Sequence, residues 1–299
     1  MQIARDGAYM PHGHADLGQG EESLRMIAHP QFAEAARSLA TNMLASAAGD
    51  EALGGVFKDA GRYVTALWVG YLHATGGMTL ARLKELCAAS GYLSPGRARS
   101  LLQFLQHVGY VAVITPPGAG ARPRYEPTPL YFAAWRSHSA AALRAAAIVA
   151  PDVTGLIDRM EEAGVFETFL CVHAARLHDR ARVSDAMSAF FQIFPNRYAG
   201  LLMVMTFVET GGPDDFPSAG EIPVSLSAAA RRFGVSQIHI RRMLTDATRA
   251  GLLLYDAKGT VRLEEEARTA IRFFYASQLA ELVASAQLTL ARLADARPG

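Results

Sequence analysis

Residues 61–77 read GRYVTALWVGYLHATGG, and residues 196–212 read NRYAGLLMVMTFVETGG. The two stretches align without a gap at an offset of 135, because 196 − 61 = 135. Seven of the 17 aligned positions are identical, including Arg62 on Arg197, whereas chance would give about one or two. The chain therefore contains an internal duplication, and the fold of one copy predicts the fold of the other.

The similarity continues downstream of both stretches. After an insertion at residues 213–223, Thr79 aligns on Ser225 at an offset of 146, and both are hydroxyl residues that can cap a helix. Further on the offset becomes 142, and one helical stripe recurs as Ala98, Leu102, Leu105 and Gly109 in the first copy and Ile240, Leu244, Ala247 and Gly251 in the second. The i, i+4, i+7, i+11 spacing predicts a helix that ends at a glycine in each copy.

Each copy is predicted to contain two short helices, a tight turn between them and a β-hairpin. In the second copy the helices are expected at residues 226–233 and 236–250, and the strands at 252–255 and 260–263. In the first copy they are expected at residues 80–89, 94–108 and 110–115, followed by a Gly/Pro-rich hairpin tip at 116–123. Flanking helices are expected at residues 30–47, 59–75, 130–147, 165–178, 196–210 and 264–293.

These patterns predict a mainly α-helical protein with a pseudo-two-fold duplication. We expect a flexible N-terminal segment at residues 1–29, a first repeat at 30–150, and a second repeat at 151–299 that ends in a long helix. With 299 residues, 51% of them hydrophobic, the chain is long enough for each repeat to bury its own core.

Residues 234–263, GVSQIHIRRMLTDATRAGLLLYDAKGTVRL, resemble the MarR-like winged helix-turn-helix regulators. The pattern V-S-x-x-x-I-R-R-x-L followed by x-G-L-L is common in bacterial recognition helices, and RYEPTPLYF at residues 124–132 is similar to the exit of such a wing. The resemblance implies two winged units with dimerisation-type helices, binding to double-stranded DNA, and a small aromatic or phenolic effector. Members of that family are usually single-copy chains that form homodimers, so this chain would be a single-chain pseudo-dimer, with further self-association left open.

The charge distribution agrees with a polyanionic partner, although the net charge is only +1. Residues 80–126 carry six basic and two acidic side chains, giving +4, and residues 225–263 carry seven and two, giving +5. The remainder of the chain then carries 1 − 9 = −8. Two basic islands therefore coincide with the two repeated helix-turn-helix segments.

The second recognition helix is predicted to present a polar face to DNA. With about 100° per residue, burial of the stripe around Ile240 directs the other side of the helix outward. Because the first turns of a recognition helix reach base edges, we expect base reading by Gln237, His239 and Arg241 and a thymine-methyl contact by Ile238. Phosphate contacts or outward positions are expected for Ser225, Ser236, Arg242, Thr245 and Arg249.

The first copy has a smaller and less basic surface, so the two copies should not read the same sequence. Its candidates are Arg97, Arg99 and Gln103 on the helix and Arg122 and Arg124 on the longer wing, where an arginine gains from the negative potential of the minor groove. Lys258 is the counterpart on the shorter wing. The alternative is that these Arg-rich faces are only solvated, or that a degenerate winged helix binds another protein.

An effector site is predicted from the two Arg-Tyr pairs that open apolar helices. A buried arginine needs an anionic partner, which is either a protein carboxylate or the carboxylate of a ligand. The ligand hypothesis names Arg62, Tyr63, Trp68, Tyr71, Arg197 and Tyr198. A protein carboxylate is the favoured partner of the arginines, and Trp68 and Tyr71 are more often core residues than pocket residues.

Other classes of protein are disfavoured by what the sequence lacks. Cys87 and Cys171 form no metal-ligand spacing, and no P-loop, nucleophile elbow or H-E-x-x-H motif occurs, so we expect no metal, no cofactor and no enzyme activity. The N-terminus lacks a signal-peptide pattern, and the apolar runs are shorter than the roughly 20 residues that span a bilayer. We therefore expect a cytoplasmic protein without a membrane partner.

A transcriptional regulator is the leading function on these grounds. A replication-initiator-like protein is the runner-up, because such proteins also carry two unequal winged helices in one chain. An interaction module, or a helical accessory part of an enzyme, comes third. An operator near the gene, repeated origin sequences, or a lack of salt-sensitive DNA binding would separate the three.

Overall fold

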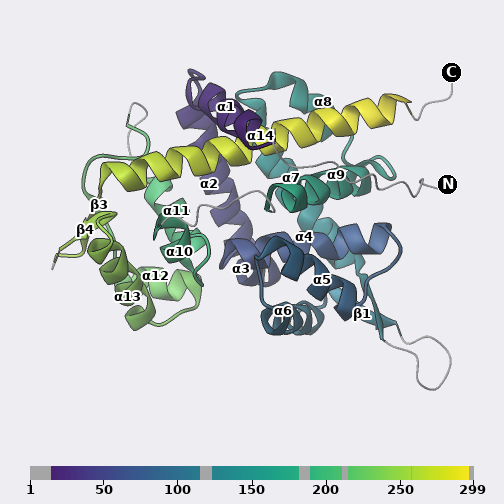
Figure 1. Ribbon diagram of the computed structural model, residues 1–299, viewed down its shortest axis with the longest axis horizontal. Coiled ribbons are helices and arrows are strands. Elements are labelled where there is room, and N and C mark those ends of the chain that lie inside the picture. Colours follow the sequence, from purple (N-terminus) through teal and green to yellow (C-terminus); the bar gives the residue numbers. More distant parts are fainter. Residues whose placement is uncertain (1–14, 115–122, 182–188, 211–214, 257, 296–299) are drawn as a thin grey trace.

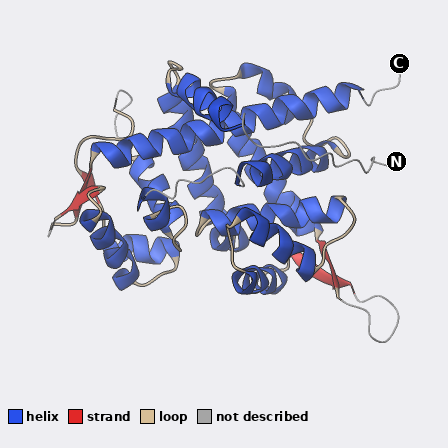
Figure 2. Cartoon of the chain, viewed as in Figure 1, coloured by secondary structure: helices blue, strands red, loops and turns tan. Residues whose placement is uncertain are grey.

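The protein is mainly α-helical and has two small antiparallel sheets in its computed structural model (Figure 1). The structure describes residues 15–114, 123–181, 189–210, 215–256 and 258–295. Figure 2 shows that the strands lie at two outer corners of the molecule and that helices fill the space between them. None of the helices in the described ranges is both long and apolar enough to cross a membrane.

The same order of elements occurs twice along the chain. The first unit, residues 58–147, contains α4 (Ala60–Ala74), α5 (Leu80–Ser90), α6 (Pro95–His107), β1 (Val111–Ile114), β2 (Arg124–Pro127) and α7 (Pro129–Ala147). The second unit, residues 196–295, contains α11 (Gly200–Glu209), β3 (Ile222–Pro223), α12 (Leu226–Phe233), α13 (Gln237–Arg249), β4 (Leu253–Tyr255), β5 (Thr260–Leu263) and α14 (Glu265–Asp295). The predicted bounds of the short helices and of the hairpin strands agree with these to within one or two residues.

Equivalent residues make equivalent backbone hydrogen bonds in the two units. Tyr110 N donates to Leu105 O at 2.8 Å, and at an offset of 142 Leu252 N donates to Ala247 O at 3.0 Å. The turn between the two short helices uses a left-handed glycine in both units, Gly91 with φ 71° and Gly234 with φ 59°, a conformation that costs glycine little. Thr79 and Ser225 cap α5 and α12 as predicted, and Ser94 and Ser236 cap α6 and α13.

A strand that the sequence did not predict completes the second sheet. β3 pairs with β5, with Ile222 opposite Val261, and β4 lies on the other side of β5. The first unit has a weaker version of this contact, a single bridge from Met78 to Tyr125 of β2. Residues 213–223 were interpreted as an insertion only, because a two-residue strand is too short to produce an alternating pattern.

The helix that precedes each unit packs against both units. α2 (Phe32–Gly49) packs against α7 and α11, whereas α9 (Val165–Ala181) packs against α14 and α4. Each of these helices therefore contacts the last helix of its own repeat and the first helix of the other unit. The chain is long enough for each repeat to bury its own core, but the crossed contacts join the buried residues of the described ranges into one continuous core.

The N-terminal segment differs from its prediction. α1 (Ala15–Ile27) is a helix that packs against α14, with Met26 and Ile27 against the core. A flexible segment over residues 1–29 is therefore wrong from residue 15 onward, and residues 1–14 lie outside the described residues. The polar, glycine-containing composition concealed the helix, because the packing on α14 supplies stability that local sequence does not.

Short helices connect the larger elements and were also not predicted. α3 (Glu51–Val56) precedes α4, and α10 (Ala189–Ile193) precedes α11. A 3-10 turn (Pro151–Val153) and α8 (Thr154–Ile157) follow α7. Runs of four to six residues carry too few turns for a helical period to be recognised.

Candidate nucleic-acid interface

α13 is an amphipathic helix with one buried face and one exposed face. Ser236 Oγ accepts from His239 N at 3.1 Å and so begins the helix. Three of the four positions in the predicted inward stripe are confirmed, because Ile240, Leu244 and Ala247 are fully buried, whereas Gly251 is exposed. The opposite face is exposed, and it carries Gln237, Ile238, Arg241, Arg242 and Arg249 together with the half-buried Thr245.

Two arginines on this exposed face make no direct polar contact with the part of the chain that the structure describes. The side chains of Arg241 and Arg242 form no hydrogen bond or ion pair with the described part of the chain. Arg249 lies 3.4 Å from Asp246 at the end of the same face. An unpaired guanidinium on a helix face keeps all of its donors available for phosphate or base atoms.

Shallow open depressions lie beside these side chains. One is lined by Ile238, Arg241, Arg242, Thr245, Asp246 and Arg249 along α13. The other lies at the turn between α12 and α13 and is lined by Ser227, Ala230, Arg231, Gly234, Val235, Ser236 and Gln237. One depression therefore lies over the predicted recognition face, and the other lies at the start of α13.

His239 differs from its neighbours because its ring is turned toward the protein. Its Nε2 atom donates to the carbonyl oxygen of Tyr198 at 2.7 Å, and the two rings meet edge to face at 6.4 Å. The ring nitrogen expected to read a base edge is thus occupied by a backbone acceptor. The base-reading prediction for His239 is not supported in this conformation, whereas Gln237 and Arg241 remain exposed.

α6 presents fewer free cations than α13. Ser94 Oγ accepts from Arg97 N at 3.4 Å, and Arg99 and Gln103 are exposed on the outer face. Arg97 is exposed too, but its Nη2 lies 2.9 Å from Asp59 Oδ2. Burial raises the pKa of Asp59, and the hydrogen bonds and charges around it act in the opposite direction. Arg97 therefore forms an ion pair with Asp59, which the sequence did not predict.

The hairpins place further cations at the two outer corners. Arg124 is exposed on β2 and lies beside Gly77, while Arg122 lies outside the described residues. Lys258 is exposed in the turn between β4 and β5. Asp256 Oδ1 fixes this turn by accepting from Lys258 N at 2.9 Å and from Thr260 N at 2.8 Å.

The two candidate helices lie on the same side of the molecule. Figure 1 shows α6 and α13 along the edge opposite to α14, with the hairpins of β1 and β4 toward the outer corners. The two helices themselves therefore lie along one edge of the protein. Such a placement is required if both helices are to meet one ligand.

The six residues predicted to form an effector pocket do not converge. Tyr63 Oη lies 3.2 Å from His138 Nε2 of α7, and burial raises the pKa of the Tyr63 phenol. Trp68 is buried and donates through Nε1 to Ala174 O of α9 at 3.3 Å. Successive residues of one helix point in different directions, so α4 delivers these side chains to different neighbours.

The two arginines of that set have different partners. Arg197 Nη1 pairs with Asp246 Oδ2 at 2.7 Å, the protein carboxylate that the alternative interpretation required. Arg62 is half-buried and forms no ion pair with the described residues; its Nε donates to Gly55 O at 2.7 Å. Tyr198 is 41% exposed and Tyr71 is half-buried on another side of α4. The six side chains therefore do not line one common pocket, and an effector site beside either α4 or α11 stays a prediction.

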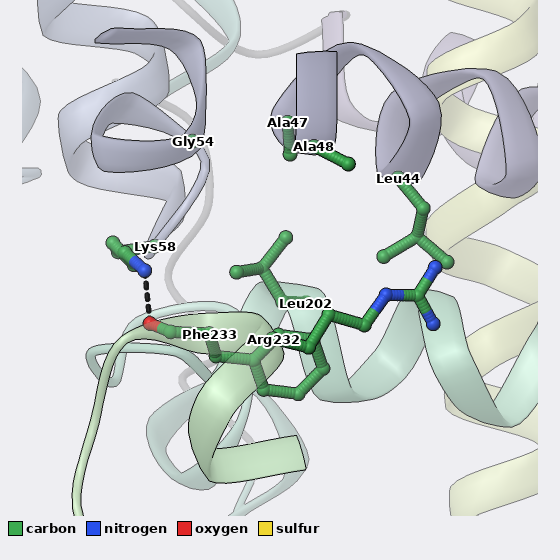
Figure 3. Close-up of a pocket in the computed structure, with 8 residues that line it drawn as sticks. All are labelled: Leu44, Ala47, Ala48, Gly54, Lys58, Leu202, Arg232 and Phe233. Carbon is green, nitrogen blue, oxygen red and sulfur yellow. Dashed lines mark hydrogen bonds between the residues drawn. The ribbon is translucent and has the colours of Figure 1, made fainter. Parts of the chain in front are cut away.

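A small cavity lies instead between α2, α3 and α12 (Figure 3). Its volume of about 30 Å³ is close to that of one water molecule. Lys58 lines this cavity and donates to Phe233 O, and burial lowers the pKa of the Lys58 ammonium. None of the six predicted effector residues is among those that line it, which are Leu44, Ala47, Ala48, Gly54, Lys58, Leu202, Arg232 and Phe233. Sequence reasoning missed Lys58, although Lys-Asp immediately before an apolar helix was a visible signal.

Comparison with known proteins does not assign this chain to a family. No protein family, no curated protein and no solved structure matches it. Within the described ranges, no group of three or more His, Cys, Asp or Glu side chains is arranged to hold a metal ion.

Proposed function

We propose that this protein is a sequence-specific, double-stranded DNA-binding transcriptional regulator with two MarR-like winged helix-turn-helix units in one chain. The order of elements in each unit supports the winged-helix interpretation: two short helices, a glycine turn, and an antiparallel hairpin that contacts the segment before the first short helix. The recurrence of the same backbone hydrogen bonds at an offset of 142 supports the duplication.

The exposed face of α13 is the strongest support for DNA binding. α13 exposes Gln237, Ile238, Arg241 and Arg242 from its first two turns, and the two arginines make no direct polar contact within the described ranges. A winged-helix protein places the first turns of its second short helix in the major groove. Arginine binds the edge of guanine through two hydrogen bonds, so an unpaired arginine there suits base recognition.

The two units contribute unequally in this proposal. α13 supplies most of the base recognition, whereas α6 offers Arg99 and Gln103 and has Arg97 committed to Asp59. Arg124 and Lys258 lie on the hairpins and are suited to contacts with the phosphate backbone or the minor groove. A site read by such a chain is asymmetric.

Regulation by a small aromatic effector stays a prediction that rests on the family resemblance. Of the residues named for it, Arg62 alone combines partial burial with the lack of an ion-pair partner in the described part of the chain. The cavity beside Lys58 is too small for an aromatic ring. An effector would therefore need a conformation more open than this one.

Selection of bound genomic fragments tests the proposed function. Fragments retained by the purified chain should share a sequence, and their binding should weaken steeply as salt is raised, because cations on the protein replace counterions on DNA. The double variant Arg241→Ala and Arg242→Ala should retain little enrichment. Arg25→Ala, which removes an exposed arginine from α1, is the matched control and should enrich the same fragments. Enrichment of repeated origin sequences would favour a replication initiator. A lack of salt-sensitive DNA binding would exclude both the transcriptional regulator and the replication initiator.

A further inference from the structure

We infer that Arg62 is a positioning residue that fixes the placement of α6 relative to α13 by binding Tyr198 of the other unit. The inference rests on the proposed function for its consequence on DNA, while the placement itself is a property of the protein alone. Arg62 belongs to the first unit, and Tyr198 lies two residues before the start of α11 in the second.

Three consecutive contacts join the two helices. The guanidinium carbon of Arg62 lies 5.0 Å from the centroid of the Phe104 ring on α6 and 5.9 Å from that of Tyr198. The carbonyl oxygen of Tyr198 accepts from His239 Nε2 of α13 at 2.7 Å. A cation over an aromatic face is attractive, and the attraction grows when water is partly excluded, as it is around the half-buried Arg62.

Both ends of this connection are held by further contacts. Arg62 N donates to Asp59 Oδ1 at 2.9 Å, and the other carboxylate oxygen of Asp59 binds Arg97 of α6. Lys58 crosses to the second unit as well, since its Nζ donates to Phe233 O and lies 5.8 Å from the Tyr198 ring centroid. Two cations of the first unit thus meet one ring of the second.

The backbone next to Tyr198 is set in an unfavourable conformation. Ala199 has φ 64°, and no other non-glycine residue in the described ranges has a positive φ. A side chain with a Cβ atom rarely adopts this region, so the surroundings must determine it. The result is that Tyr198 is held at the junction between the units although its side chain is 41% exposed.

The two units carry different residues at the position that contacts the arginine at the start of α4 or just before α11. Asp246 of α13 binds Arg197 within the second unit, and its aligned counterpart at an offset of 142 is Phe104. A carboxylate would hold the Arg62 guanidinium within the first unit. The Phe104 ring instead contacts the guanidinium and leaves it free to contact Tyr198 as well.

The consequence for DNA is a preference for one separation between half-sites. Two recognition helices held at a fixed placement can enter the groove together only where the half-sites match that placement. Helices that move independently tolerate several separations. Arg62 thereby contributes to specificity without contacting DNA.

Distance measurements in the absence of DNA test the placement directly. Spin labels at Ser100→Cys on α6 and Arg242→Cys on α13, in a chain with Cys87→Ala and Cys171→Ala, report the distance between the two helices. We expect a narrow distribution in this background, and a clearly broader one after Arg62→Met or Tyr198→Leu. Tyr198→Phe keeps the ring and should leave the distribution narrow. Circular dichroism checks that each variant folds. If Arg62→Met does not fold, Tyr198→Leu tests the same contact, because the Tyr198 side chain is partly exposed and its loss should not unfold the protein.

A second measurement uses the chain with its native cysteines and duplexes whose two half-sites are separated by different numbers of base pairs. The parent should prefer one separation by about tenfold, and Arg62→Met should reduce that preference to about twofold or less. An unchanged distance distribution in both Arg62→Met and Tyr198→Leu overturns the inference whatever the DNA result. A broader distribution in a protein that binds no DNA would retain the positioning role and overturn the proposed function.

Discussion

Arg197 Nη1 lies 2.7 Å from Asp246 Oδ2 and so ties the start of α11 to α13. The hydrogen bond and positive charge of Arg197 lower the pKa of Asp246. In the first unit the same two positions are Arg62 and Phe104, whose contact is a cation over a ring at 5.0 Å. The duplicated units therefore keep the location of this contact and change its chemistry.

The ion pair between Arg197 and Asp246 should make a modest contribution to stability. Both side chains are partly exposed, so solvent weakens their attraction, and we expect a small coupling free energy between them. A double-mutant cycle with Arg197→Met and Asp246→Asn, followed by urea unfolding, measures it. A coupling near zero would show that the contact is incidental.

Arg241→Ala should weaken binding to the selected site by about 1–3 kcal/mol and relax its base preference. The reason is that Arg241 is exposed near the start of α13 and has no protein partner in the described ranges. Lys258→Ala, on the hairpin turn, should weaken all sequences alike and reduce the salt slope by about one. Titrations on specific and random duplexes measure both effects. Equal losses on the two duplexes for Arg241→Ala would remove it from the base-reading residues.

Gly70→Ala should destabilise the fold by about 1–3 kcal/mol through overpacking. A Cβ atom at Gly70 would come within 2.3 Å of Leu170 Cδ2, at the contact between α4 and α9 that joins the two repeats. Gly155→Ala in α8 is the matched control, because its Cβ atom would meet no atom within 4 Å. Urea unfolding compares the two variants, and equal stabilities would contradict the crossed packing of α4 and α9.

The protein should lose stability as the pH falls from about 6.5 toward 5. Burial lowers the pKa of His138 to about 3 and that of His173 to about 4, so both are neutral in the folded state. Histidines in the unfolded chain bind protons below about pH 6.5, which favours unfolding as the pH decreases until the folded pKa values are reached. Urea midpoints at pH 7.5, 6.5, 5.5 and 5.0 measure the trend.

A variant separates the histidines from other acid-sensitive groups. His138 lies between Tyr63 Oη at 3.2 Å and Ser46 Oγ at 3.4 Å. His138→Gln keeps a polar side chain there and removes one titrating group, so its urea midpoint should fall less between pH 6.5 and 5. The same slope in parent and variant would assign the pH dependence elsewhere.

Local features of the sequence predicted most of each unit. The caps Ser94 and Ser236, the left-handed Gly91 and Gly234, and the buried stripe of α13 are determined by residues close together in the chain. Short-range signals of this kind fix where helices begin, where they end and which side is buried.

The contacts that cross between the units could not be predicted in the same way. These contacts join residues that are 38 or more positions apart. They are the packing of α2 on α11 and of α9 on α4, the ion pair of Arg97 with Asp59, and the hydrogen bond from His239 to Tyr198. Hydrophobic periodicity identifies a buried face without identifying its partner. The contacts of Arg97 with Asp59 and of His239 with Tyr198 were not predicted for this reason, and DNA contact by either residue stays a prediction.

The central claim is that one chain carries two unequal DNA-reading helices. It is tested most directly by measuring the mass of the complex with the selected DNA by light scattering and by footprinting the same complex. The account predicts one chain per site and a footprint over two different half-sites about one helical turn, or roughly 34–36 Å, apart. A palindromic site occupied by two chains would contradict it.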